Sequence, residues 1–151
     1  MKREIEIKIR EAYQTLFEAW EALRKHQNDE AIRKAIKCIK ASMETVRKTS
    51  KYLFNNEDII KTSDKIIEKM NGIIRLERRR IARALLIERI WLNPYLIRLV
   101  EKGTLDLKPK SILKEEEARI AVDHASEVYY WADSVVFKLI KSNKIQLNNK
   151  S

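Results

Sequence analysis

Glycine and proline are almost absent from this chain, which has two of each in 151 residues. No glycine-rich loop is present that could cradle a phosphate group. The four residues lie where a helix is expected to end or bend, at Gly72, Pro94, Gly103 and Pro109. This scarcity predicts an all-α protein.

Cysteine and histidine are also scarce. The single Cys38 can form no internal disulfide and has no second cysteine with which to hold a structural metal, so it fits a reducing compartment. We interpret Cys38 as a small core residue. The two histidines form no His-Glu-x-x-His pairing and supply no base for a cysteine nucleophile. The sequence therefore predicts no metal, no cofactor and no enzymatic activity.

Long hydrophobic runs are missing as well. No segment approaches the ~20 apolar residues that a membrane-spanning helix needs. Met1-Lys2-Arg3 is followed by Glu4 and Glu6 instead of the apolar segment of a secretory signal. We expect a protein that is cytoplasmic and nucleoid-associated, without membrane contact. A chain of 151 residues is enough for one domain that buries roughly two-thirds of its unfolded surface.

Positive charge is abundant. The chain carries 32 Lys and Arg against 22 Asp and Glu, which gives a net charge of +10 and a pI near 9.7. Such a balance is compatible with nucleic acid or with an acidic partner. A helical protein rich in Lys, Arg and Glu is also typical of heat-adapted surfaces. Non-specific contact with DNA is therefore one interpretation of the positive charge, and a heat-adapted surface is the other.

Apolar residues recur at steps of three and four along most of the chain, as in amphipathic helices. We expect long helices over residues 4–26, 28–56, 57–93 and 111–141, and a short helix over 95–101. The sequence thus predicts a helical bundle of about four long helices plus one short helix. We expect residues 1–141 to form a single helical domain and residues 142–151 to form a polar, frayed C-terminal tail.

Several helix ends carry recognisable signals. Asn28 and Asp29 are good N-cap types for the second helix, and Asn55-Asn56 is expected to close it. Asp58 places a carboxylate at the positive end of the third helix. Gly72, in the middle of that helix, indicates a close helix contact or a modest kink.

The last helix is apolar on more than one side. One face alternates strictly by three and four: Ala118, Ala121, Ala125, Val128, Ala132, Val135 and Leu139. A second face carries Tyr129, Tyr130, Trp131, Val136, Phe137 and Ile140. This surplus must be covered by the core or by a partner. We assign Trp20, Trp91 and Trp131 to core packing, with an interface anchor as the alternative for Trp91.

A dense arginine cluster occupies the third helix. Arg75, Arg79 and Arg83 are spaced four apart and therefore line one face, which predicts a basic contact surface that would suit a phosphate backbone. The alternative is a solvated or salt-bridged surface, since Glu77 and Glu88 lie on the same helix. Aromatic residues that could stack unpaired bases are not interleaved with the cluster.

One spacing raises a catalytic alternative. Arg119 is followed after four residues by His124, which is similar to the Arg and His pair of HEPN ribonucleases, themselves small helical bundles. Ile120 stands where that family commonly has a polar residue. Positions five apart on a straight helix diverge by roughly 140°. We favour a chance match in an arginine-rich chain.

The middle and end of the chain resemble the helical domain of GINS replication proteins. Residues 58–85 resemble that family's central helix, which carries an apolar pair, a short charged stretch and then small and apolar residues. Residues 105–107 and 113–117, with Val128 and Tyr129 further on, look like its next helix. The likeness covers roughly residues 57–130 and lacks the family's β domain and its N-terminal Phe-Tyr pair.

This resemblance implies a non-catalytic scaffold subunit of a GINS-like DNA replication complex. Such a subunit would bind other GINS subunits and bridge the MCM helicase and a RecJ-like partner, within a hetero-oligomer. We expect its packing and partner-binding residues to be Ile73, Ile74, Ile81, Leu85, Val128 and Trp131. The alternatives are a helical nucleic-acid-binding small subunit of a ribonucleoprotein complex and a HEPN-like ribonuclease.

Overall fold

The computed structural model describes residues 2–70, 74–94 and 112–149, with side-chain surroundings given for 2–70, 77–94 and 114–141. These residues form five helices and contain no strand, which confirms the all-α prediction. The expected short helix over 95–101 lies outside the described residues. No helix in the described ranges is long and apolar enough to cross a membrane.

The first two helices form a hairpin. α1 spans Lys2–Arg24 and α2 spans Asn28–Phe54. His26 turns the chain with a left-handed φ of 58°, and the Gln27 N–H bonds the Ala22 carbonyl at 2.9 Å. The N-cap of α2 is Gln27, which makes no side-chain capping bond. The predicted caps Asn28 and Asp29 instead lie inside the first turn of α2.

The end of α2 was predicted correctly. Asn55 adopts the left-handed conformation, with φ 56°, and its N–H bonds the Lys51 carbonyl, as in a helix C-cap. Asp58 then caps α3 through Oδ1, which accepts the N–H of Ile60 at 2.9 Å. The hydroxyl oxygens of Ser50 and Thr62 lie 2.9 Å apart, and this hydrogen bond joins the start of α3 to α2.

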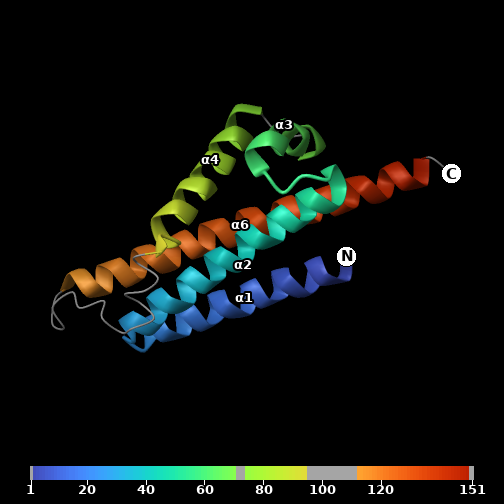
Figure 1. Ribbon diagram of the computed structural model, residues 1–151. Helices are drawn as coiled ribbons and strands as arrows, with labels where there is room; N and C mark the ends of the chain where they lie inside the picture. Colours follow the sequence, from blue (N-terminus) through green and yellow to red (C-terminus); the bar gives the residue numbers. More distant parts are fainter. Residues whose placement is uncertain (1, 71–73, 95–111, 150–151) are drawn as a thin grey trace.

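The predicted third helix over 57–93 is wrong as a single rod, because the structure divides it into α3 (Ile59–Met70) and α4 (Ile74–Trp91). Arg78 Nη2 lies 2.9 Å from Asp64 Oδ1. A continuous helix would separate residues fourteen apart by about 21 Å. The chain must therefore fold back between α3 and α4, as Figure 1 shows.

The last helix, α6, spans Ile112–Asn149 and extends well beyond Lys141, so the expected frayed tail is helical as far as Asn149. The alternation predicted for one face is confirmed as core, because all seven of its residues are buried. Its small side chains let α2 approach closely, and Cys38 Sγ of α2 lies 3.9 Å from the Ala125 carbonyl. Burial raises the pKa of the Cys38 thiol to about 12.

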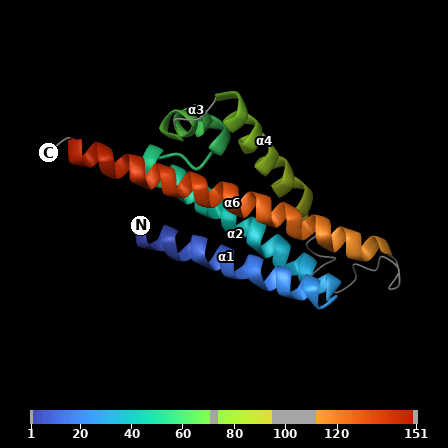
Figure 2. The same ribbon diagram turned by 180° about the vertical axis from the view of Figure 1, so that it is seen from behind.

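Three long helices lie side by side, with α3 and α4 against one flank (Figures 1 and 2). α1 runs antiparallel to both α2 and α6. α2 packs extensively against both of its long neighbours, whereas α1 touches α6 much less. α4 packs against α6, α3 and α2 to similar extents, and the ion pair between Arg47 and Glu88 joins it to α2. The limited contact between α1 and α6 leaves part of each helix face uncovered.

Candidate functional site

Three predicted partner-binding residues are buried inside the chain itself. The exposed fractions are 4% for Ile81, 1% for Val128 and 7% for Trp131. Leu85 is half-buried and packs against the same core. These four residues hold α4 on α6 and on the rest of the bundle, so they have little surface left for a partner. Ile73 and the side chain of Ile74 lie outside the described residues.

The predicted basic row is divided between different surroundings. Arg83 forms an ion pair with Glu127 of α6, whereas Arg79 is exposed. The side chain of Arg75 lies outside the described part of the chain. Arg80, which belongs to the arginine cluster but not to the predicted row, is exposed on the side of α4 that faces α6. Among the residues that the structure describes, no ion pair involves Arg79 or Arg80.

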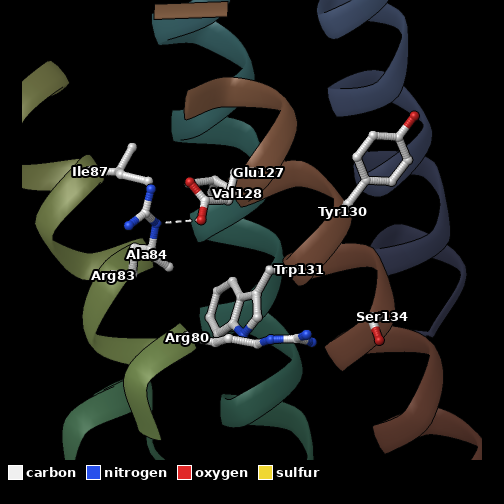
Figure 3. Close-up of a pocket in the computed structure, with 9 residues that line it drawn as sticks. All are labelled: Arg80, Arg83, Ala84, Ile87, Glu127, Val128, Tyr130, Trp131 and Ser134. Atoms are coloured by element: carbon white, nitrogen blue, oxygen red, sulfur yellow. Dashed lines mark hydrogen bonds and ion pairs between the residues drawn. The ribbon is translucent and has the colours of Figure 1, made fainter. Parts of the chain in front are cut away.

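A cleft lies between α4 and α6, with a volume of about 320 Å³ (Figure 3). The apolar residues Ala84, Ile87 and Val128 form part of its wall. Its polar lining comes from Arg80, Arg83, Glu127, Tyr130, Trp131 and Ser134. Three of the site residues named from the sequence, Arg83, Val128 and Trp131, thus meet at one place, although Arg83 comes from α4 and the other two from α6.

Hydrogen-bond donors outnumber available acceptors in this cleft. The Glu127 carboxylate already binds Arg83, as the dashed line in Figure 3 shows. The indole nitrogen of Trp131 is buried and has no hydrogen-bond partner among the described residues. A buried donor left without an acceptor costs about 1–3 kcal/mol. The cleft therefore suits a ligand that brings acceptor oxygens.

Aromatic rings do not line this cleft in a way that would stack bases. Trp131 is almost fully buried, and the Tyr130 ring points away from α4 in Figure 3. The fold thus brings aromatic residues from α6 to the arginine cluster, but neither presents an open ring face to it. Base stacking is not a function that this geometry supports.

A second surface, on the other side of α6, carries exposed aromatic side chains. Tyr13, Phe17 and Trp20 are spaced four and three apart and lie on one side of α1, each about half exposed. On α6, the side chains of Tyr130 (58%) and Phe137 (64%) are exposed. We call these five residues the aromatic face. The assignment of Trp20 to the core was wrong, whereas Trp91 and Trp131 are buried as predicted.

Three tyrosines link the two helices of the aromatic face. The Tyr13 ring lies 5.6 Å from that of Tyr129, and the Tyr129 ring lies 5.2 Å from that of Tyr130 in an edge-on arrangement. Burial first, and then the nearby charge of Asp133, raises the pKa of Tyr129 to about 12. These contacts fix the spacing of α1 and α6 at the middle of the face.

A groove continues from these tyrosines between the first half of α1 and the second half of α6. Half of its lining residues are apolar: Ile9, Val136, Phe137 and Ile140. Charged residues of both signs also line it: Lys2, Glu6, Asp133 and Lys141. Glu6, Ile9 and Asp133 also line the neighbouring hollow beside Tyr13 and Tyr129, so the two depressions are continuous.

Arg119 and His124 have different partners. Arg119 binds Glu115, one turn earlier on α6, at 3.1 Å. His124 accepts a hydrogen bond from Trp91 of α4 at 2.9 Å. The two side chains that carry the likeness to HEPN ribonucleases are thus engaged separately. Within the described ranges, no group of three His, Cys, Asp or Glu residues could hold a metal ion.

No known protein family, curated protein or solved structure was found to match this chain. The GINS resemblance therefore remains a prediction, and the single central helix on which it was based corresponds to two helices in the structure, α3 and α4.

Sequence reasoning named only part of both surfaces. Tyr13, Phe17 and Trp20 were detectable as a stripe at helical spacing. The prediction for this helix instead followed its core face, which contains Leu16 and Ala19. Tyr130 and Phe137 were recognised as part of an apolar surplus, and they are the members of that surplus that stay most exposed. Nothing in the sequence indicated that Arg80 and Ser134 would line the same cleft.

Proposed function

We propose that this protein is a non-catalytic helical scaffold subunit that binds a partner protein through the aromatic face and the adjoining groove. The observation that carries the proposal is the set of half-exposed aromatic side chains on α1 and α6. Large exposed apolar patches mark interaction sites on soluble proteins, and Tyr, Trp and Phe are enriched there.

The groove favours an amphipathic helix as the bound element. Two antiparallel helices form its walls, so a third helix could lie along them as in other helix-in-groove complexes. Ile9, Val136 and Ile140 would receive apolar side chains spaced three and four apart. Glu6 and Lys141 would face charged residues of opposite sign on the partner.

The GINS resemblance supplies a specific setting for this docking role. Under that proposal, the chain would join other GINS subunits and bridge the MCM helicase and a RecJ-like protein, in a nucleoid-associated hetero-oligomer. The support for this setting is the likeness of residues 57–130 to the family's helices. The docking surface itself lies mostly outside that region, on α1 and on the second half of α6.

Matched variants of the tagged protein test the docking surface in the native cell. Phe137→Ser removes the most exposed aromatic side chain of the face, whereas Tyr52→Ser changes a residue of α2 that is 45% exposed and does not line the groove. We expect the wild type and Tyr52→Ser to co-purify with the same partner. Phe137→Ser should weaken binding of that purified partner at least tenfold. Equal binding by all three proteins would refute the surface.

Co-expression tests the proposed setting separately. As a scaffold subunit with an uncovered apolar face, the isolated chain should self-associate or aggregate, and it should become monodisperse when a second GINS subunit is co-expressed. Light scattering measures both states. A stable monomer that binds no GINS subunit would refute the proposed role in replication. The docking surface would then still be tested by the variants above.

A further inference from the structure

The cleft between α4 and α6 has a chemistry that the docking role does not use. Its lining includes Arg80, Arg83, Trp131 and Ser134, whose side chains all carry hydrogen-bond donors. The one carboxylate at the cleft, that of Glu127, is occupied by Arg83. A ligand for such a site needs negative charge and several acceptor oxygens.

The unpartnered indole nitrogen is the observation that separates this cleft from an ordinary basic surface. Trp131 is 7% exposed, and its Nε1 has no acceptor among the described residues. In Figure 3 the Arg80 side chain extends from α4 past the nitrogen-bearing edge of the indole. Because Arg80 is exposed, its side chain can move aside to meet an anion without any unpacking of α4. An oxygen of that anion would then reach the Trp131 N–H.

We propose that this cleft binds a phosphate group, held by Arg80, Trp131 Nε1 and Ser134, beside the ion pair of Arg83 with Glu127. Arginine presents paired donors that match the oxygens of a phosphate, and the net charge of +10 attracts anions to the molecule. The cleft volume of about 320 Å³ is enough for a phosphate and a sugar. No open aromatic ring faces the site, so it recognises the phosphate and not a base. The source is either a nucleic acid backbone or a soluble phosphate ester.

Nuclear magnetic resonance of the three tryptophan indole groups tests the site in the full chain. Inorganic phosphate at 20 mM should shift the Trp131 indole N–H signal and leave that of Trp20 in place, with sodium chloride at equal ionic strength as the reference. Glutamate at the same concentration tests a carboxylate in place of phosphate. A Trp131 signal that moves with glutamate but not with phosphate would overturn the assignment. A Trp131 signal that moves with neither anion would also overturn it.

A pair of arginine variants separates the cleft from the predicted basic row. Arg80→Ala and Arg79→Ala remove the same charge from neighbouring exposed positions of α4, but only Arg80 lines the cleft. Binding of a labelled 15-nucleotide single strand, a 15-base-pair duplex and adenosine monophosphate is measured by anisotropy or by the Trp131 signal at 50 mM NaCl. We expect Arg80→Ala to weaken binding at least fivefold and Arg79→Ala less than twofold.

The probes distinguish the two phosphate sources. Arg80-dependent binding of either strand form identifies a nucleic acid backbone, and Arg80-dependent binding of the nucleotide alone identifies a soluble ester. Both results support the phosphate site. Equal losses in the two variants, a larger loss in Arg79→Ala, or no binding of any probe would each refute it.

Discussion

The indole N–H of Trp91 donates a hydrogen bond of 2.9 Å to Nδ1 of His124 and so joins the end of α4 to α6. The two rings also meet edge-on, with their centroids 6.2 Å apart. To accept this bond, His124 must be neutral, with its proton on Nε2. In this arrangement the histidine positions α4, which forms one wall of the cleft.

Replacing this histidine should destabilise the protein. His124→Ala removes the acceptor and leaves the nitrogen of the buried Trp91 unpaired, which we expect to lower the free energy of unfolding by about 1–3 kcal/mol. Urea denaturation followed by circular dichroism measures the change. Asp123→Ala is the control, because it changes the exposed residue next to His124 on the same helix. A loss no larger than that of the control would show that the bond contributes nothing to stability.

The ion pair between Arg47 and Glu88 should contribute to the attachment of α4. Both guanidinium Nη atoms of Arg47 donate to the Glu88 carboxylate, whose side chain is only 14% exposed. This hydrogen bonding raises the pKa of Arg47, so the guanidinium stays charged. We expect Glu88→Gln to cost about 1–3 kcal/mol of stability and to speed hydrogen exchange in α4.

The surface pair between Arg33 and Glu30 supplies the comparison for that variant. Its two side chains are 45% and 39% exposed, so Glu30→Gln should cost less than about 0.5 kcal/mol. Exchange in α4 that is unchanged by Glu88→Gln would contradict the anchoring role of the pair.

Cys38 should make the protein sensitive to alkaline pH. The thiol pKa is about 12 in the folded protein against 9.0 for a thiol that is not buried, so Cys38 loses its proton at lower pH in the unfolded chain. Stability from this group is complete below pH 9 and falls as pH rises between 9 and 12. At pH 10.5 the loss relative to pH 8 should be roughly 2 kcal/mol. Denaturation curves at the two pH values measure it.

Two variants identify the source of that alkaline loss. Cys38→Ala should remove the decline that begins at pH 9, and Tyr129→Phe should reduce only the part above pH 10, because the Tyr129 pKa is also raised to about 12. The native thiol should be unreactive towards a disulfide reagent at pH 8, because it is buried and protonated. Rapid labelling of the folded protein would contradict its burial.

Local sequence signals were sufficient for much of the fold. The small residues spaced three and four apart on α6 predicted its core face, and Asn55 and Asp58 predicted the break between α2 and α3. The fold-back after Met70 was missed because helical periodicity continues on both sides of residues 71–73, and Gly72 alone was interpreted as a close helix contact or a modest kink. The burial of a helix face follows from its own sequence, whereas a reversal between two helices depends on what each packs against.

The candidate surfaces show the same limit. Arg83 and Trp131 were both named from the sequence, but their meeting depends on how α4 lies on α6, which no local pattern encodes. Trp20 was placed in the core because it adjoins Ala19, yet 100° of rotation per residue turns it towards the groove side of α1. The exposure of Trp20 therefore became visible only once the packing of the helices was known.

Photo-crosslinking in the native cell tests the docking proposal most directly. A photoreactive p-benzoyl-phenylalanine replaces Phe137 in one strain and Tyr52 in another, and mass spectrometry identifies the crosslinked peptides. We expect position 137, but not position 52, to capture a peptide from another protein whose apolar residues are spaced three and four apart as in an amphipathic helix. Capture of the same peptides at both positions, or of a second copy of this chain alone, would contradict the proposed scaffold role.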